Sequence, residues 1–293
     1  IASESNDFLW LNCDDPVVRE RLDTSNTESL RQLFGKHHTV FIDEAQRITN
    51  TGLTLKLVTD TFKTIQLLVS GSSSFELADR INEPLTGRKW EYLLYPVSWR
   101  EFTDHVGQLN AARQLESRIL YGMYPEVISN SGDEKEILRQ LTDSFLYKDL
   151  LAFEGIRKPK LVVNLLRALA LQIGNEVSYN ELSRLLQVDN KTVSAYIDLL
   201  EKAFIVFRLS PYRRNLRTEI GKSRKIYFYD TGVRNALIAN FNPLSMRQDT
   251  GALWENFLLA ERIKRNHYSR RWVNQYFRSE EHTSELKSRQ SIS

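Results

Sequence analysis

The chain has 293 residues, of which 41% are hydrophobic and 26% charged, which is typical of globular domains and excludes disordered and collagen-like classes. This length allows two domains or three small ones. The single cysteine, Cys13, excludes an internal disulfide and a cysteine-based zinc site, and no apolar run approaches the roughly 18 residues that a membrane helix needs. We therefore expect a cytoplasmic protein with no membrane partner.

The net charge of +3 conceals an uneven distribution of charged residues. Residues 1–50 hold nine acidic and five basic side chains, whereas residues 208–225 hold one acid and seven bases. Residues 262–272 hold five bases and no acid. An acidic N-terminal part and a basic C-terminal part indicate different functions for the two halves of the chain. Each basic run is also compatible with a solvent-exposed face.

The two ends of the chain differ from the rest. A strand-like run, Phe8–Leu11, follows only a short, largely polar segment, so we expect further sequence upstream of Ile1. Residues 278–293 begin RSEEHTSEL, a string without helical or strand periodicity that resembles a translated sequencing adapter. This adapter-like artefact tail is excluded from the fold prediction, as a fusion scar would be.

The first third of the chain predicts strands that alternate with helices. Four apolar runs favour strands: Phe8–Leu11, Thr39–Ile42, Ile65–Val69 and Trp90–Tyr95. A helix is expected to start at Asp14-Asp15-Pro16, because proline suits the first helical position, and another is expected over Leu53–Phe62. The alternation predicts a parallel sheet of α/β type.

From Pro96 onward the pattern becomes mostly helical, with breaks at Pro125 and Pro159. Apolar residues at three- and four-residue spacing predict helices over Ser98–Phe102, Ala112–Tyr121, Glu134–Phe153 and Lys160–Ile173. Later elements predict a helix-turn-helix with a wing, and then a helix and a strand. Their ranges are Tyr179–Gln187, Thr192–Ala203, Phe204–Leu209, Lys225–Tyr229, Asp249–Lys264 and Arg271–Phe277.

The stretch Thr39–Glu44 carries the strongest chemical signal. Four residues suited to a buried strand are followed by Asp43 and Glu44. At the carboxyl end of such a strand, nucleotide hydrolases use the first acid for Mg²⁺ and the second to activate water. The alternative is a solvated Asp-Glu turn that caps the next helix.

A second strand, Leu67–Val69, also ends in small polar residues, among them Ser72 and Ser73, which could sense a phosphate. Arg88 follows this strand in the sequence. Its guanidinium either stabilises phosphate charge in a transition state or belongs to an ordinary surface residue. The phosphate-binding string G-x-x-x-x-G-K-S/T is absent. Gly221-Lys222-Ser223 matches its last three positions, but Leu216 replaces the first glycine and the segment leads into a strand.

Several strings together resemble one family, the prokaryotic AAA+-like ATPases whose C-terminal part is a domain of unknown function, number 4143. They are TVFIDEAQ (39–46), LVSGSSS (68–74), LTGR (85–88), LYPVSWREF (94–102), YGMYPEV (121–127), YKDL (147–150), KIYFYDTG (225–232) and GALWENFLLAE (251–261). Met123 departs from a glycine in the family pattern.

This resemblance implies roles for the candidate residues. Asp43 would hold Mg²⁺, Glu44 would be the catalytic glutamate, Ser72 and Ser73 would lie near ATP, and Arg88 would resemble an arginine finger. The phosphate-binding loop would lie upstream of Ile1, so the fragment is expected to be inactive alone, with a gap in the sheet beside Ile65–Val69. The first hypothesis is thus a fragment of a Mg²⁺-dependent ATPase.

The resemblance also implies the fold class and domains. We expect an α/β chain in which a partial P-loop AAA+-like parallel sheet lacks its first strand (1–104). A helical lid (105–160), a winged helix-turn-helix (161–235) and the start of a restriction-endonuclease-like domain (236–277) follow. Glu255 matches an acid of that last fold, but one glutamate cannot be assigned nuclease chemistry, because such chemistry needs several acids.

The alternative hypothesis is a DNA-binding or protein-interaction module built on the winged helix. Outward-facing Lys191, Thr192 and Tyr196 would lie on the recognition helix, and Arg213, Arg214 and Arg217 on the wing. Such bases would bind DNA phosphates in a salt-dependent way. Winged helices in ATPases also serve structural roles or bind protein, so the partner stays open between DNA and protein.

Overall fold

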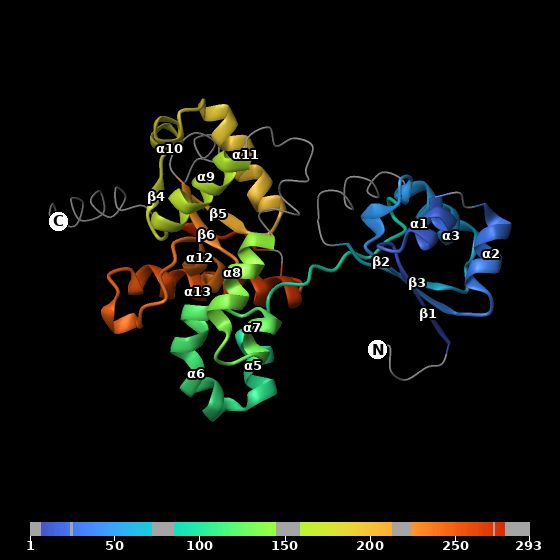
Figure 1. The fold of residues 1–293 in the computed structure, drawn as a ribbon, viewed down its shortest axis with the longest axis horizontal. Helices are drawn as coiled ribbons and strands as arrows, with labels where there is room; N and C mark the ends of the chain where they lie inside the picture. Colours follow the sequence, from blue (N-terminus) through green and yellow to red (C-terminus); the bar gives the residue numbers. More distant parts are fainter. Residues whose placement is uncertain are drawn as a thin grey trace, which may run out of the picture. The chain divides into compact units, whose positions relative to one another are not determined.

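The computed structural model describes residues 7–23, 26–71, 85–144, 159–212, 224–271 and 273–278. The chain divides into two compact units, residues 1–93 and 94–293 (Figure 1). No helix in the described ranges is long and apolar enough to cross a membrane.

The first unit is built on a parallel sheet of three strands in the order β1-β2-β3. The strands are β1 (Phe8–Asn12), β2 (Thr39–Asp43) and β3 (Gln66–Val69), so the first three predicted strands are confirmed. Val40 and Ile42 of β2 are fully buried, as expected for a central strand.

The fourth predicted strand, Trp90–Tyr95, is wrong, because these residues form no strand. Among the described residues β3 pairs with β2 alone, so no strand pairs with this run. The side chains of Trp90, Tyr92 and Leu94 remain 82%, 74% and 95% exposed. A β-leaning sequence becomes a strand only where a second strand satisfies its backbone groups.

Helices α1 (Pro16–Asp23), α2 (Thr27–Phe34) and α3 (Thr51–Thr61) and the short 3₁₀ helix η1 (Ala45–Arg47) connect the three strands. Pro16 is the first residue of α1, as predicted, and the Val17 amide donates to the Asp15 carboxylate over 2.8 Å. The helices bury Leu22, Leu30, Phe34, Leu55 and Val58 in one core with β1 and β2. Burial of each such side chain contributes about 1.5–3 kcal/mol.

The second unit begins with helices that largely follow the predicted ranges. They are α5 (Trp99–Val106), α6 (Gln108–Tyr121), α7 (Pro125–Ser129), α8 (Glu134–Ser144) and α9 (Pro159–Leu171). The part of the predicted helix Glu134–Phe153 that follows Ser144 lies outside the described residues. Both prolines named as breaks, Pro125 and Pro159, stand at the first position of a helix.

Next come two helices and a mixed sheet. Helices α10 (Tyr179–Leu186) and α11 (Asn190–Lys202) are joined by a tight turn. The sheet has the order β4-β6-β5-β7, with β4 (Glu176–Val177), β5 (Val206–Pro211), β6 (Arg224–Phe228) and β7 (Tyr276–Phe277). Strands β5 and β6 pair in antiparallel fashion. Of the described residues in the predicted strand Arg271–Phe277, the last two pair, with Ser210 and Pro211.

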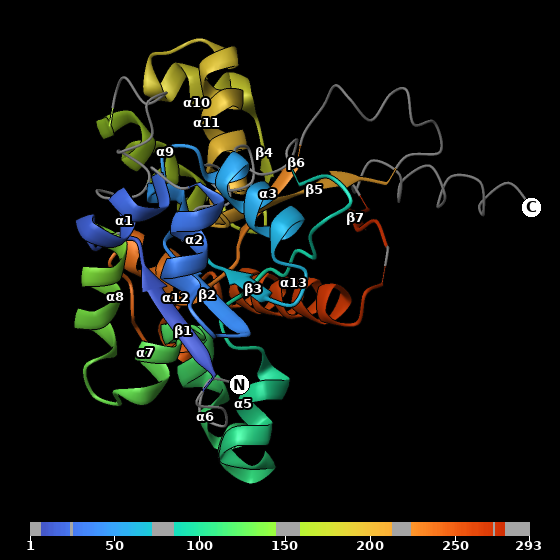
Figure 2. The ribbon, with the colours of Figure 1, turned by 90° about the vertical axis from the view of Figure 1, so that its right-hand side faces the viewer.

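The unit closes with α12 (Thr231–Leu237), the 3₁₀ helix η4 (Leu244–Met246) and the long helix α13 (Thr250–Tyr268). Ala260 of α13 packs against Phe207 and Leu209 of β5, and the side chain of Arg208 pairs with acids of α11 instead. Alternate residues of β5 therefore face different helices. Figures 1 and 2 accordingly draw α10 and α11 on one side of the β5–β6 pair and α13 on the other.

Candidate functional site

The carboxyl end of β2 brings an acid and a hydroxyl group together. Asp43 is the last residue of β2, and Ser70 directly follows β3. Because Ile42 is in register with Val69, the next residues of the two strands lie side by side. The Ser70 hydroxyl donates a hydrogen bond to Oδ1 of Asp43, and the Ser70 amide donates to the Ile42 carbonyl over 2.9 Å.

Glu44 turns away from the strand direction immediately after Asp43. Its backbone is left-handed, with φ 54° and ψ 39°, and it precedes η1. A residue other than glycine in this region costs of order 1–3 kcal/mol, and such residues cluster at functional sites. The Glu44 carboxylate accepts a hydrogen bond of 2.7 Å from Nε2 of Gln46, which is 6% exposed. Two acids in sequence thus present carboxylates at the same sheet edge.

Ser70 is the polar residue that sequence reasoning missed. The predicted residues Ser72 and Ser73 lie outside the described residues. A signal for Ser70 was available, since the two apolar runs end at Ile42 and Val69 and parallel strands of equal length bring the following residues together. Asp43 and Ser70 are those following residues.

Arg88 lies away from the two acids. Its Nε donates to Oδ1 of Asp60 over 3.0 Å, in the last turn of α3. The first residue of α3, Thr51, donates its hydroxyl to the carbonyl of Ala45, two residues after Asp43. At 1.5 Å per residue, Asp60 lies about 14 Å further along the helix. The structure therefore does not bring Arg88 together with Asp43 and Glu44.

The donor set at the sheet edge suits magnesium in part. Asp43, Glu44 and Ser70 offer only oxygen atoms, and no three acids, histidines or cysteines converge in a metal-binding group within the described ranges. Mg²⁺ is commonly held by one or two carboxylates and completes its shell with water and substrate phosphates. Nearby Cys13 is fully buried, and burial, together with the Asp43 charge, raises the pKa of its thiol to about 11, so it is a core thiol.

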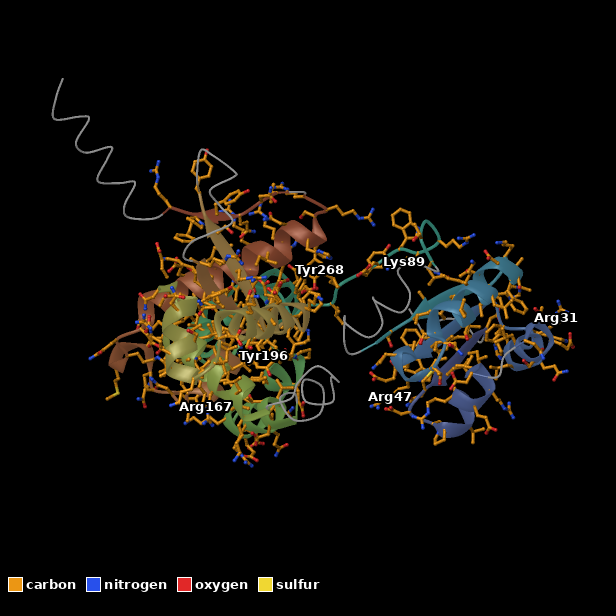
Figure 3. The ribbon with its side chains drawn as sticks, turned by 90° about the horizontal axis from the view of Figure 1, so that it is seen from above. Arg31, Arg47, Lys89, Arg167, Tyr196 and Tyr268 are labelled. Carbon is orange, nitrogen blue, oxygen red and sulfur yellow. The ribbon has the colours of Figure 1, made fainter. Side chains whose placement is uncertain are left out.

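The residues that were predicted to contact nucleic acid lie in different environments. Lys191 is exposed at the start of α11, whereas Thr192 donates its hydroxyl to the Asp189 carboxylate over 3.0 Å and completes the helix cap. Tyr196 is half-buried and is labelled in Figure 3. The structure does not describe three further residues of this set: Arg213, Arg214 and Arg217.

Glu255 serves as a partner within the second unit. Its Oε1 accepts hydrogen bonds from the Tyr227 hydroxyl over 2.8 Å and from Nζ of Lys225 over 3.4 Å. Both donors lie on β6, so the glutamate ties α13 to the sheet. This contact indicates a structural role for Glu255.

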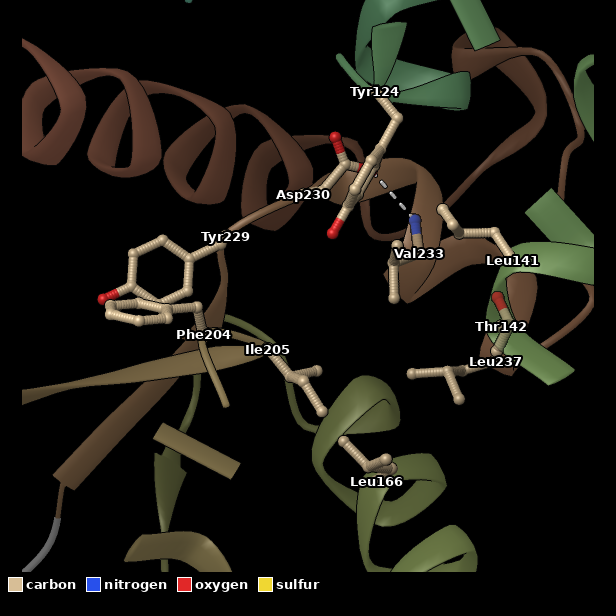
Figure 4. A pocket seen from close by; sticks show the side chains of 10 residues that line it. All are labelled: Tyr124, Leu141, Thr142, Leu166, Phe204, Ile205, Tyr229, Asp230, Val233 and Leu237. Carbon is tan, nitrogen blue, oxygen red and sulfur yellow. Dashed lines mark hydrogen bonds between the residues drawn. The ribbon is translucent and has the colours of Figure 1, made fainter. Parts of the chain in front are cut away.

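The buried carboxylate of Asp230 forms a junction that sequence reasoning did not single out. It accepts the amides of Met123 (2.7 Å) and Val233 (3.0 Å), the second of which is drawn in Figure 4, and so joins the α6–α7 connection to α12. Burial raises the pKa of Asp230. A cavity of about 20 Å³ lies beside it. Its lining is mostly apolar, with Leu141, Leu166 and Leu237 among its residues, so we assign the junction a structural role.

Comparison with known proteins finds family models that match two parts of the chain. Residues 1–103 match the family model described as AAA domain. The match supports an AAA-like ATPase class and nucleotide use for this part of the chain. Residues 112–244 match a second model, described as Domain of unknown function (DUF8612). The predicted number of that domain, 4143, is therefore wrong.

Several relatives match most of the chain, and all of them are described as uncharacterized. A protein of Mycobacterium tuberculosis is 30% identical over 268 residues, covering 89% of this chain and 58% of the relative. A protein of Methanocaldococcus jannaschii is 25% identical over 281 residues, covering 89% and 61%. One of Haemophilus influenzae is 26% identical over 249 residues, covering 80% and 60%. The chain thus spans about three fifths of these relatives, and no solved structure matches it.

Proposed function

We propose that this chain is part of a Mg²⁺-dependent ATPase of the AAA-like class. The observation that carries the proposal is the pairing of Asp43 with Ser70, next to Glu44, at the carboxyl edge of a parallel sheet. Open α/β sheets bind ligands at that edge, and the segment matches the AAA domain. Because the 293 residues contain no G-x-x-x-x-G-K-S/T string, we propose that they do not hydrolyse ATP by themselves.

The residues divide the chemistry as follows. Asp43 would hold Mg²⁺, and Ser70 orients its carboxylate through the hydroxyl hydrogen bond. When bound, the metal ion neutralises phosphate charge. Glu44 would accept the proton of the attacking water, with its carboxylate held by Gln46. Ser72 and Ser73 would contact the phosphates of ATP.

Arg88 fits a different place in this scheme. Its ion pair with Asp60 keeps it about one helix length from the acids, so we propose that it acts on nucleotide bound by a second copy. Arginine fingers supplied from another chain stabilise phosphate charge in this manner.

Sequencing across the native locus tests the ATPase proposal first. We expect an in-frame G-x-x-x-x-G-K-S/T string upstream of Ile1, and a frame that lacks one would remove the basis for ATP hydrolysis. In the extended protein, Glu44→Gln should lower the turnover of ATP about 10²- to 10⁴-fold while ATP binding is retained. Glu28→Gln, an exposed acid of α2 paired with Arg31, is the matched control and should change neither.

The second candidate, a DNA- or protein-binding module, is favoured by the order of elements after α9. Two helices joined by a tight turn precede the β5–β6 pair, and β4 pairs with the outer edge of β6, an arrangement typical of winged helices. On this proposal Lys191, Thr192 and Tyr196 face DNA together with Arg213, Arg214 and Arg217. The assignments of 105–160, 161–235 and 236–277 to a lid, a winged helix and a nuclease-like start stay predictions.

A binding assay separates this candidate from the ATPase. Reversing Arg213, Arg214 and Arg217 to glutamate should abolish salt-dependent duplex binding if the wing contacts phosphates. Unchanged binding would remove the wing from the interface. Capture of a specific protein by the wild-type chain, without duplex binding, would favour the protein-interaction alternative.

A further inference from the structure

The C-terminal half of α13 presents an arginine-rich surface that neither proposed function uses. Arg262 and Arg265 are exposed, as are Arg270 and Arg271 just after the helix. We call these four residues the α13 surface. On the helix, Arg262 and Arg265 share one face with Leu258, which is 58% exposed.

The orientation of this face is fixed by the packing on the other sides of α13. Phe257 and Ala260 are buried, and Lys264 is 1% exposed, with its Nζ bound to the Val97 carbonyl over 3.1 Å. Tyr268, labelled at the end of the helix in Figure 3, accepts the Tyr95 amide over 3.2 Å. The helix therefore cannot rotate to hide its arginines.

Acids of the same helix do not pair with Arg262, Arg265 and Arg271. The acids of α13 have other partners: Glu255 binds Lys225, and Glu261 binds Lys264 and the Trp99 amide. Arg262, Arg265 and Arg271 form no ion pair with any described residue. Arginines near a helix C-terminus interact favourably with the helix dipole. That effect is confined to the last turn, so it does not account for Arg262.

We propose that the α13 surface binds the phosphate backbone of duplex nucleic acid. Arginine forks match phosphate oxygens in a bidentate geometry, and a cluster of exposed arginines attracts a polyanion. Arg262 and Arg265 stand one turn apart, so about 5–6 Å separates their side-chain origins, which lets each reach a phosphate of its own. The contact is independent of base sequence, because it uses no base edge.

The rival surface on α11 carries less free charge. Asp198 and Glu201 of α11 form ion pairs with Arg208. Thr192 is engaged in the helix cap, so Lys191 is the exposed base among the described residues of the first turns of α11. Figures 1 and 2 both draw α11 and α13 on different sides of the β5–β6 pair. Substitutions can therefore test the two surfaces separately.

The test is a titration of a fluorescent 20-base-pair duplex with the full chain, followed by anisotropy at several salt concentrations. The variant Arg262→Gln/Arg265→Gln/Arg271→Gln removes three positive charges. It keeps polar, unbranched side chains whose helix propensity is close to that of arginine. Each phosphate contact contributes about 0.9 to the slope of log affinity against log salt. We expect the slope to fall by about 2–3 and the affinity at low salt to fall at least tenfold.

Two matched variants complete the design. Lys160→Gln/Arg167→Gln/Arg113→Gln removes three exposed bases elsewhere in the unit and should leave the slope within about 0.5 of wild type. Lys191→Gln separates the α13 surface from α11, because a large effect of Lys191→Gln alone would assign binding to α11 and overturn the proposal. So would equal slopes for wild type and the α13 variant, or absence of duplex binding by a wild-type chain that binds anionic vesicles. Circular dichroism should be unchanged, because the substituted side chains are exposed.

Discussion

Replacing Gly122 by alanine should be among the most damaging single substitutions in the second unit. Gly122 ends α6 with φ 77° and ψ −166°, a region almost restricted to glycine. A Cβ atom there would stand 2.0 Å from Oδ1 and 2.5 Å from Cγ of Asp230. The backbone conformation alone costs about 1–3 kcal/mol for a residue with a side chain.

The collision adds to the backbone cost, because Asp230 can move aside only by giving up its hydrogen bonds. If its carboxylate moves, it loses the Met123 and Val233 amides, and a hydrogen bond to a charged group contributes about 1.5–3 kcal/mol. We therefore expect Gly122→Ala to lower the free energy of unfolding by about 3–6 kcal/mol more than the backbone cost. That is a large share of the roughly 5–15 kcal/mol available to a domain.

Gly107 provides a matched control. It ends α5 with φ 84° and ψ 148°, and a Cβ atom at Gly107 would meet nothing within 4 Å. Urea unfolding followed by circular dichroism should therefore show Gly107→Ala losing only the backbone cost. In an Asp230→Ala background the extra cost of Gly122→Ala should vanish, because the obstructing carboxylate is gone. Equal losses for the two alanine variants, or no coupling with Asp230→Ala, would refute the reasoning.

Three further predictions concern ion pairs of the second unit. Arg247 and Arg234 lower the pKa of Asp249 to about 2, so the carboxylate stabilises the fold above its unfolded pKa of about 3.9, and this stability is lost as pH falls toward 2. Asp249→Asn should therefore destabilise the protein at neutral pH but not at pH 2 in urea titrations; equal losses at both pH values would contradict this. Arg208→Met should cost about 1–3 kcal/mol in urea unfolding, because it leaves Asp198 and Glu201 facing each other without a cation; no loss would show the pairs to be dispensable. Lys264→Met should lower the melting temperature, because the Val97 carbonyl and Glu261 then lose a buried hydrogen-bond donor, at a cost of about 3–5 kcal/mol. The control Arg262→Met replaces an exposed arginine and should have little effect.

Local sequence patterns were sufficient for elements that depend on their own residues. The β2 run, the Asp15-Pro16 start of α1 and the long apolar face of α13 each carry a complete local signal, and all three were predicted. Trp90–Tyr95 and the first part of Arg271–Phe277 have β-leaning residues but lack a neighbouring strand along their length. Strand formation there depended on distant residues, which no local pattern reports.

The candidate site shows the same division. Asp43 and Glu44 follow from the end of one apolar run, and Ser70 follows from comparing two runs in register. The position of Arg88 depends on its partner Asp60, and the engagement of Thr192 depends on the cap of α11. Such partner choices arise from tertiary contacts, so residue type and spacing could name these side chains but not say what they bind.

The hydrogen bonds that close the second unit span long stretches of chain, with consequences for its synthesis. Asp230 bonds Met123 across 107 residues, Asn235 bonds Leu120 across 115, and Lys264 bonds Val97 across 167. At about 5–20 residues per second, a ribosome needs on the order of ten seconds to deliver Asp230 after Met123 has been made. During that interval α5 and α6 lack their later partners, so the nascent chain exposes apolar surface that chaperones can bind until α13 arrives.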